Sequence, residues 1–289
     1  MNAKMNHHLP CVREDQSLGE ILDAAQLKKV LFGILRDVHS FCERNGIRYC
    51  LYGGTLLGAI RHKGFIPWDD DIDIAMPRPD YERFCETYSS DRYSVHTFKT
   101  DPDYLMPFAK VCDDRTVLVE NRYPHISLGV NLDVFPLDGV DSLEDARRKE
   151  IRRRNLYFFL DLRNVSPQQI RREYRHWFFR TVQHFALRLV PNRLLVGRFE
   201  RDMAKTRFEE SPFRGCVVWG YGVSETCPAS VYSIFEETKP FESGRFHVQN
   251  GWHEYLESVF GDYMQLPPED KRKTAHSSRA WWKTPASAE

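Results

Sequence analysis

One stretch, from Leu51 to Met76, constrains the fold of this chain more than any other. The β-prone run Arg48–Tyr52 stops at Gly53 and Gly54, and Thr55–His62 then has the composition of a short helix. A strand that ends in paired glycines before a helix exposes backbone N–H groups to an anion, because no Cβ blocks its close approach. The sequence therefore predicts a phosphate-binding unit in which Gly53, Gly54 and Thr55 orient a diphosphate.

The other end of this stretch is acidic. After the Pro67-Trp68 turn, acidic and apolar residues alternate from Asp71 to Ile74, as they do on a half-buried strand. This alternation places Asp71 and Asp73 on one face, where two neighbouring carboxylates repel each other unless a cation lies beside them. A hard divalent cation, Mg²⁺ or alternatively Mn²⁺, offsets that repulsion and leaves coordination sites for phosphate oxygens.

Neither motif is informative alone, since paired glycines usually form a turn and Asp-x-Asp usually lies on a solvated strand edge. Together, on two strands joined by one helix and a return, they indicate a metal-assisted phosphoryl- or nucleotidyl-transfer site. Arg61, His62 and Lys63 lie between the motifs and offer cationic or protonatable side chains to the diphosphate of a nucleotide donor. A solvated turn is the alternative for these three residues.

Three segments in order carry a family resemblance. The first begins at Gly53 and reads G-G-T-L-L-G-A-I-R-H-K-G-F-I-P-W-D-D-D-I-D-I-A-M-P-R-P-D-Y-E-R-F. The others are N-L-D-V-F-P-L-D-G at 131–139 and Y-L-E-S-V-F-G-D-Y-M-Q-L-P-P-E-D-K-R at 255–272. They resemble the LicD family of phosphocholine transferases, a branch of the nucleotidyltransferase superfold that includes the fukutin-type enzymes. The resemblance spans about Gln26 to Arg272. It implies an α/β (α+β) fold: a nucleotidyltransferase-type mixed sheet flanked by helices, with a mostly helical C-terminal part.

The resemblance also implies an activity and the residues that perform it. Phosphocholine would pass from CDP-choline to a sugar hydroxyl of a lipid-linked glycan acceptor, of lipopolysaccharide or teichoic acid type, with release of CMP. Asp71, Asp73 and Asp133 would be the metal ligands and the catalytic carboxylates. Asp133 would accept the proton of the attacking hydroxyl or bridge to a second metal. Lys110 would steady the charge on the transferred phosphate.

Alternatives stay open for individual residues and for the reaction. Asp133 points away from its aliphatic neighbours in a predicted strand, and Asp138 in the turn after it is the alternative third carboxylate. Lys110 could lie exposed on an edge strand, and Glu242 is a further candidate for the site. The competing functions are transfer of ribitol or glycerol phosphate from another CDP-alcohol, a metal-dependent glycosyltransferase, and a non-catalytic binding module.

Composition excludes several classes of protein. The 289 residues carry 41 basic and 41 acidic side chains, so no overall positive field marks a nucleic-acid-binding protein. The seven cysteines are odd in number and form no Cys-x-x-Cys pair, which favours reduced thiols over disulfides or a zinc site. No apolar run reaches the length of a membrane span, and the N-terminus lacks a signal-peptide core. We expect a cytoplasmic protein that can also act at the inner face of the plasma membrane.

The chain changes character along its length. We predict a disordered N-terminus (1–16), a nucleotidyltransferase-type catalytic core (17–140), a basic, aromatic helical subdomain (141–210), a return to the core with a C-terminal clasp (211–272), and a tail (273–289). For the first helix, the pattern predicts a capping box at Ser17 and Glu20 and a stop at Asn45-Gly46.

The helical subdomain is strongly basic. From Arg152 to Arg198 there are eleven arginines but only two acidic residues, Asp161 and Glu173. The arginines could line solvated faces around a small aromatic core. Residues 147–199 could instead make a peripheral contact with an anionic membrane surface, or they could bind a polyanionic acceptor. No nucleic-acid-binding motif accompanies the charge.

Overall fold

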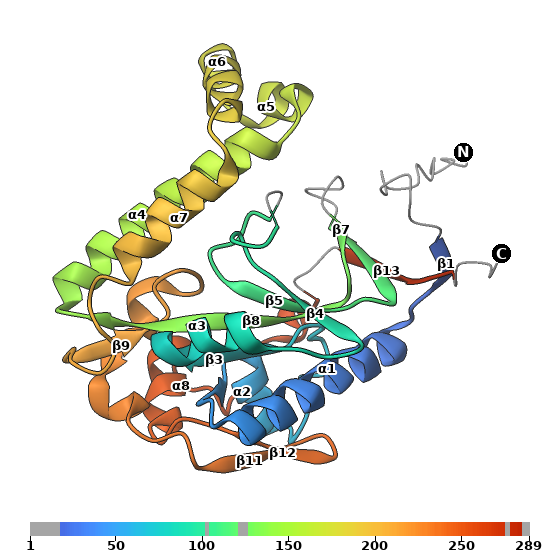
Figure 1. Cartoon of the computed structure of the whole chain (residues 1–289), viewed down its shortest axis with the longest axis vertical. Helices are drawn as coiled ribbons and strands as arrows, with labels where there is room; N and C mark the ends of the chain where they lie inside the picture. Colours follow the sequence, from blue (N-terminus) through green and yellow to red (C-terminus); the bar gives the residue numbers. More distant parts are fainter. Residues whose placement is uncertain (1–17, 102–103, 121–126, 275–277, 285–289) are drawn as a thin grey trace.

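A mixed β-sheet forms the centre of the protein (Figure 1). The computed structural model describes residues 18–101, 104–120, 127–274 and 278–284. The strands of the central sheet are β2 (Cys50–Leu51), β3 (Asp73–Pro77), β4 (Tyr93–His96), β5 (Ala109–Asp113), β8 (Asn131–Val140), β9 (Phe213–Gly215) and β10 (Cys227–Pro228). They follow the order β10-β9-β8-β3-β2, and β5 pairs with both β8 and β4. The predicted fold class, a mixed sheet flanked by helices with a mostly helical later part, is confirmed.

The register of this sheet brings three predicted site residues into one row. β3 and β8 run parallel with Asp73 opposite Asp133, and β5 runs antiparallel to β8 with Lys110 opposite the same Asp133. Ile74 and Val134 are fully buried, so the alternation of side chains sets both aspartates on the other face of the sheet. Side chains far apart in the sequence therefore meet across adjacent strands.

Four helices pack around the sheet: α1 (Ala24–Asn45), α2 (Gly53–Arg61), α3 (Arg78–Thr87) and α8 (Trp252–Phe260). α1 and α3 contact β8, whereas α2 contacts both β3 and α8. The stop predicted after α1 is confirmed, because Gly46 takes the left-handed conformation there and its N–H donates to the carbonyl of Cys42.

The capping box predicted at Ser17 and Glu20 was wrong. Glu20 lies in strand β1 (Leu18–Ile21), and Ser17 lies outside the described residues, as does the segment predicted to be disordered. The box that forms joins Asp23 to Gln26, with the two N–H groups donating over 2.9 and 2.8 Å. The helix does not begin at Ser17 because the residues that follow it form strand β1, which pairs with a strand near the other end of the chain.

That pairing belongs to a smaller sheet with the order β1-β13-β6-β7. Its other strands are β6 (Thr116–Glu120), β7 (Ser127–Leu128) and β13 (Ser278–Lys283). The tail predicted over 273–289 is thus partly a strand. Ala280 is buried, and the guanidinium of Arg115 lies 5.3 Å from the centre of the Trp282 ring.

A helical arm, which we define as 143–203, extends away from the sheet (Figure 1). It contains α4 (Leu143–Asn164), α5 (Pro167–Glu173), α6 (Trp177–Arg188) and α7 (Asn192–Met203). α4 and α7 run side by side and carry α5 and α6 at their far end. Within the described ranges, no helix combines the length and the apolar character needed to cross a membrane.

Short elements follow the arm. They are the 3₁₀ helices η1 (Gly222–Glu225), η2 (Ala229–Tyr232) and η3 (Glu269–Lys271), and the hairpin of β11 (Thr238–Phe241) and β12 (Gly244–His247). The hairpin contacts α2 through β11, and η1 contacts both α4 and α8. The six cysteines in the described part of the chain form no disulfide.

Candidate active site

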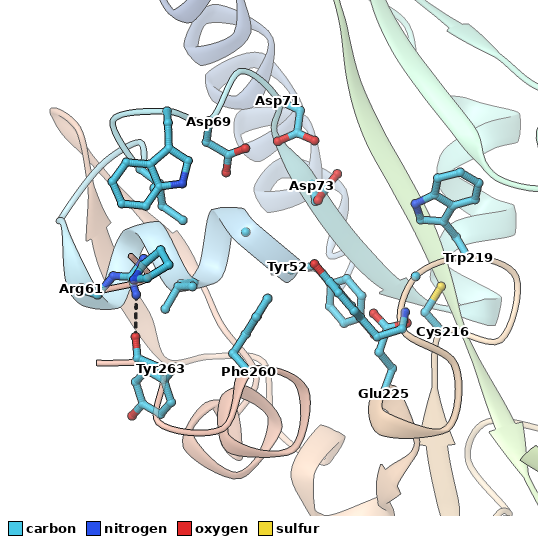
Figure 2. A pocket seen from close by; sticks show the side chains of 18 of the residues that line it. Tyr52, Arg61, Asp69, Asp71, Asp73, Cys216, Trp219, Glu225, Phe260 and Tyr263 are labelled. Carbon is cyan, nitrogen blue, oxygen red and sulfur yellow. Dashed lines mark hydrogen bonds between the residues drawn. The ribbon is translucent and has the colours of Figure 1, made fainter. Parts of the chain in front are cut away.

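A cavity of about 760 Å³ lies beside the start of β3, between α2, α8 and the loop that follows β9 (Figure 2). One side of it is acidic and is lined by Asp69, Asp71 and Asp73. The other side is largely aromatic and is lined by Tyr52, Phe135, Trp219, Tyr221 and Phe260, with Glu225 among them. The cavity therefore joins a carboxylate cluster to an aromatic wall.

Asp133 of β8 adds a fourth carboxylate close to the three that line the acidic side. Burial raises the pKa of Asp73 well above its usual range, and repulsion from Asp71, Asp133 and Asp69 raises that pKa further, while Lys110 lowers it. The four groups therefore lie within electrostatic reach of one another. Several carboxylate oxygens that face one small volume are the donor set that Mg²⁺ and Mn²⁺ prefer. These residues could hold such a cation.

Asp133 stands beside Asp73 in the sheet but does not line the cavity itself. The Lys110 ammonium lies 2.5 Å from the Asp133 carboxylate and 2.9 Å from the Oδ1 of Asn131. Lys110 is thus placed next to a carboxylate rather than in the cavity. The structure brings Asp71, Asp73, Asp133 and Lys110 together, and their chemical roles stay predictions.

The paired glycines accommodate these carboxylates. α2 begins at Gly53, which has a φ of +50°, and a Cβ there would lie 3.1 Å from the Oδ2 of Asp73. A Cβ on Gly54 would lie 2.8 Å from the Oδ2 of Asp69. The positive end of the helix dipole and the carboxylates can therefore approach each other closely. Thr55 is buried, and its hydroxyl accepts a hydrogen bond of 2.9 Å from the N–H of Asp73. Thr55 thus positions the strand rather than lining the cavity.

Gly54→Ala is expected to displace the Asp69 carboxylate, because the added methyl group would lie too close to its oxygen. We expect the Mg²⁺ concentration for half-maximal activity to rise by about tenfold or more, the scale on which residues that orient metal ligands act. The control is Gly33→Ala in α1, which is remote from the cavity. An unchanged metal requirement in Gly54→Ala would show that the carboxylate position is not critical.

Of the three candidate cations between the motifs, only Arg61 lines the cavity. Its guanidinium donates to the carbonyl oxygens of Tyr263 at 2.7 Å, shown in Figure 2, and of Gln265 at 3.3 Å. His62 lies edge-on to Trp68, and the Lys63 ammonium donates to the carbonyl of Ile60 in α2. Arg61 thus lies at the cavity while His62 and Lys63 do not line it, and phosphate contact by any of the three stays a prediction.

Two alternative site residues have other partners. Asp138 is fully buried, and its carboxylate accepts two hydrogen bonds of 2.7 Å from the guanidinium of Arg78. Glu242 accepts a hydrogen bond from the N–H of Phe65, and its own N–H donates to the carbonyl of Lys63. Asp138 therefore has a structural role, and Glu242 fastens the loop after α2 to the β11–β12 hairpin.

Sequence reasoning missed the loop that forms the aromatic side. Strand β9 ends at Gly215, and the chain then wraps around the Glu225 carboxylate, which accepts a 2.7 Å hydrogen bond from the N–H of Tyr221. Gly220 has a φ of +82°, and a Cβ there would lie 2.1 Å from Glu225. Burial raises the pKa of Glu225 to about 8. The glycines on either side of Tyr221 were the available signal for this turn.

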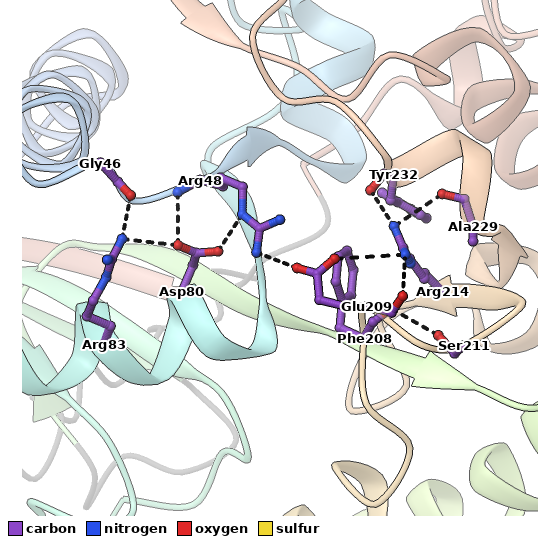
Figure 3. A network of polar contacts seen from close by, with 10 residues as sticks. All are labelled: Gly46, Arg48, Asp80, Arg83, Phe208, Glu209, Ser211, Arg214, Ala229 and Tyr232. Atoms are coloured by element: carbon purple, nitrogen blue, oxygen red, sulfur yellow. Dashed lines mark hydrogen bonds and ion pairs between the residues drawn. The ribbon is translucent and has the colours of Figure 1, made fainter.

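The same loop, and the segment that follows it, are held by two arginines. Arg153 of α4 donates to the carbonyl of Gly220 at 2.6 Å. Figure 3 shows Arg214 of β9 donating to the carbonyls of Ala229 and Tyr232, at 3.3 and 3.0 Å. The same network continues through Glu209 to Arg48 and Asp80. The aromatic side is therefore held by the central sheet and by the helical arm together.

Comparison with known proteins identifies the family of this chain. The family model described as LicD/FKTN/FKRP, nucleotidyltransferase domain, matches residues 46–159, which include the carboxylate cluster. The chain is 33% identical over 261 residues to the lipopolysaccharide cholinephosphotransferase LicD of Haemophilus influenzae, covering 87% of this chain and 95% of that protein. It is 51% identical over 41 residues to the human ribitol 5-phosphate transferase FKRP, covering 14% of this chain and 8% of that protein. The chain therefore belongs to the LicD family of transferases.

Proposed function

We propose that this protein transfers phosphocholine from CDP-choline to a sugar hydroxyl of a cell-surface glycan, such as lipopolysaccharide, and releases CMP. The observation that carries the proposal is the cavity itself, in which a carboxylate cluster and an aromatic wall face one volume. Two relatives support the broader class: their names describe a cholinephosphotransferase and a ribitol 5-phosphate transferase. A cytoplasmic location is part of the proposal.

The carboxylate cluster would act on the diphosphate. Asp71 and Asp73, with Asp69 beside them, would hold Mg²⁺, and Asp133 would complete the set. When bound, Mg²⁺ would neutralise charge on the diphosphate and on the leaving CMP. The N-terminus of α2 would face the donor phosphates, since its first residues Gly53 and Gly54 line the cavity.

Transfer would follow in-line attack on the choline-bearing phosphorus. The acceptor oxygen forms the new P–O bond, and the P–O bond to the cytidylyl phosphate breaks, so CMP leaves with the electron pair. Asp133 would take the proton of the acceptor hydroxyl, and the Lys110 ammonium lies 2.5 Å from that carboxylate.

The aromatic wall suits the donor head group. A quaternary ammonium cannot donate hydrogen bonds, and it binds to ring faces and to nearby negative charge. Tyr221 and Phe260 have ring centres 5.4 Å apart, and Trp219 lines the same cavity. Burial raises the pKa of Tyr221, and the charges of Glu225 and Asp73 raise it further. This side chain therefore lies within electrostatic reach of both sides of the cavity.

Tyr221→Ala is expected to raise the KM for CDP-choline by about tenfold, because it removes one aromatic face of the head-group site. The KM for CDP-glycerol, which lacks the ammonium, should change much less. Tyr221→Phe is the matched control, since it keeps the ring and should keep the KM for CDP-choline. Equal losses with the two donors would remove Tyr221 from the head-group site.

The test of the proposed function is product analysis by mass spectrometry. The purified protein would be incubated with Mg²⁺, a panel of CDP-alcohols and nucleotide sugars, and extracted lipid-linked glycan. We expect metal-dependent CMP release from CDP-choline and an acceptor mass increased by phosphocholine. CMP from CDP-ribitol or CDP-glycerol instead would change the substrate within the same reaction. Release of a nucleoside diphosphate with sugar added would overturn the reaction class.

A further inference from the structure

The far end of the helical arm carries large apolar side chains on its outer surface. In and just after α6, Phe178, Val182, Phe185 and Leu189 are 71%, 56%, 57% and 85% exposed. Their spacing follows the helical repeat, so they share one face of the helix. We name these four residues the outer face of α6. Trp177 and Phe179, also exposed, lie next to it.

The opposite side of α6 is packed. His184 is buried, with its Nδ1 2.9 Å from the carbonyl oxygen of Leu162. Leu187 packs against a small core of Leu162, Val165 and Ile170. The guanidinium of Arg180 lies 4.8 Å from the ring centre of Phe158. The end of the arm therefore has a core of its own, and the outer face is not the unfinished side of that core.

The charged residues of this part of the chain are almost all basic. α6 contains no acidic residue, and from Ser166 to Arg198 the only one is Glu173. The arginines of this part of the chain are Arg171, Arg172, Arg175, Arg180, Arg188, Arg193 and Arg198. An exposed apolar, aromatic helix face in a strongly basic part of the chain matches a helix that lies in the headgroup region of a bilayer.

We propose that the outer face of α6 docks on an anionic lipid bilayer, with α6 lying in the plane of the membrane surface and the arginines contacting lipid phosphates. The occupant is the bilayer rather than a second copy of the chain, because a copy would bring a second set of like charges to the contact. Docking rests on the arm alone and does not depend on the proposed function.

The arm would also set the distance between membrane and cavity. Arg153, which lines the cavity, and Asn164, at the end of α4, are separated by about 17 Å of helix at 1.5 Å per residue. A docked arm would hold the cavity above the lipid headgroups. If the proposed function is right, this places the site where the sugar part of a lipid-linked acceptor extends from the surface.

Flotation with lipid vesicles tests the docking. We expect the full-length protein to bind vesicles of phosphatidylcholine mixed with phosphatidylglycerol, to bind pure phosphatidylcholine weakly, and to lose part of its binding at raised salt. Phe178→Ser with Phe185→Ser should weaken binding by at least about tenfold. The matched control is Ile21→Ser with Ile234→Ser, which removes two apolar side chains of similar exposure away from the arm.

Two outcomes would overturn the docking. One is equal vesicle binding by the arm variant and the control. The other is no vesicle binding by the unchanged protein, together with a dimer in ultracentrifugation that the arm variant dissociates. The single variant Phe178→Ser, checked by circular dichroism, guards against misfolding of the double variant. CMP release with a water-soluble acceptor fragment reports the proposed function separately, and it should not change in either variant.

Discussion

Asp73→Asn is expected to slow transfer by at least about 10²-fold, the scale on which losing one charge-stabilising group slows an enzyme, without destabilising the metal-free protein. The pKa of Asp73 is raised by burial and then by repulsion from Asp71, Asp133 and Asp69. A carboxyl group whose pKa is higher in the folded than in the unfolded state binds its proton more tightly when folded. The free energy of unfolding therefore falls as the pH rises from the unfolded-state pKa of this carboxyl group through its folded-state pKa. The ionised group destabilises the fold at neutral pH.

An amide at position 73 removes this repulsion. Urea unfolding at neutral pH in EDTA should give this variant a free energy of unfolding equal to or above that of the unchanged protein. CMP release, measured separately with Mg²⁺, should be lost. Asp70→Asn is the control, since Asp70 does not line the cavity. If Asp73→Asn kept activity within a few-fold, Asp73 would not be part of the catalytic cluster.

Asp138→Ala should show the reverse pattern, a large loss of stability with turnover per folded molecule retained. The change leaves the guanidinium of Arg78 buried beside the single remaining carboxylate of Glu200, which lies 3.0 Å away. Breaking a buried pair in this way typically costs about 3–5 kcal/mol. Urea unfolding measures the loss.

Glu144→Ala is the matched control, because its ion pair with Arg148 is exposed and is worth less than about 1 kcal/mol. The opposite result for Asp138→Ala, loss of turnover with stability intact, would make Asp138 the third carboxylate and remove Asp133 from that role.

The acidic half of the site could be predicted because its residues are close in sequence and obey simple periodicity. The alternation around Asp71 and Asp73 and the glycine pair before them are local patterns. The place of Asp133 came from the family resemblance, and the sheet register now sets it opposite Asp73. Asp69 was missed because its position depends on its contact with Gly54, which no local pattern reports.

The aromatic half could not be predicted because it depends on contacts between distant segments. The turn at Gly220 forms around the Glu225 carboxylate and is held by Arg153 from another helix. Strand β13 was missed for a similar reason, since its partners β1 and β6 lie far away in the sequence. In each case the local residues permit several conformations, and a remote partner selects one of them.

The basic arm could be predicted only in part. Its helical character and its charge follow from composition, but composition does not show which side of α6 faces the rest of the arm. The structure turns His184 inward and leaves Phe178 and Phe185 outside. That orientation is the observation from which we propose that the arm docks on a bilayer.

The most direct test of the central claim follows each phosphorus atom through the reaction. CDP-choline carrying radioactive phosphorus only in the phosphate next to choline would be incubated with the protein, Mg²⁺ and the glycan acceptor. We predict that the label moves to the glycan together with choline, that the released CMP is unlabelled, and that Asp73→Asn stops both. Labelled phosphate in the nucleotide product, or sugar transfer with no labelled glycan, would contradict transfer of an intact phospho-alcohol by this carboxylate cluster.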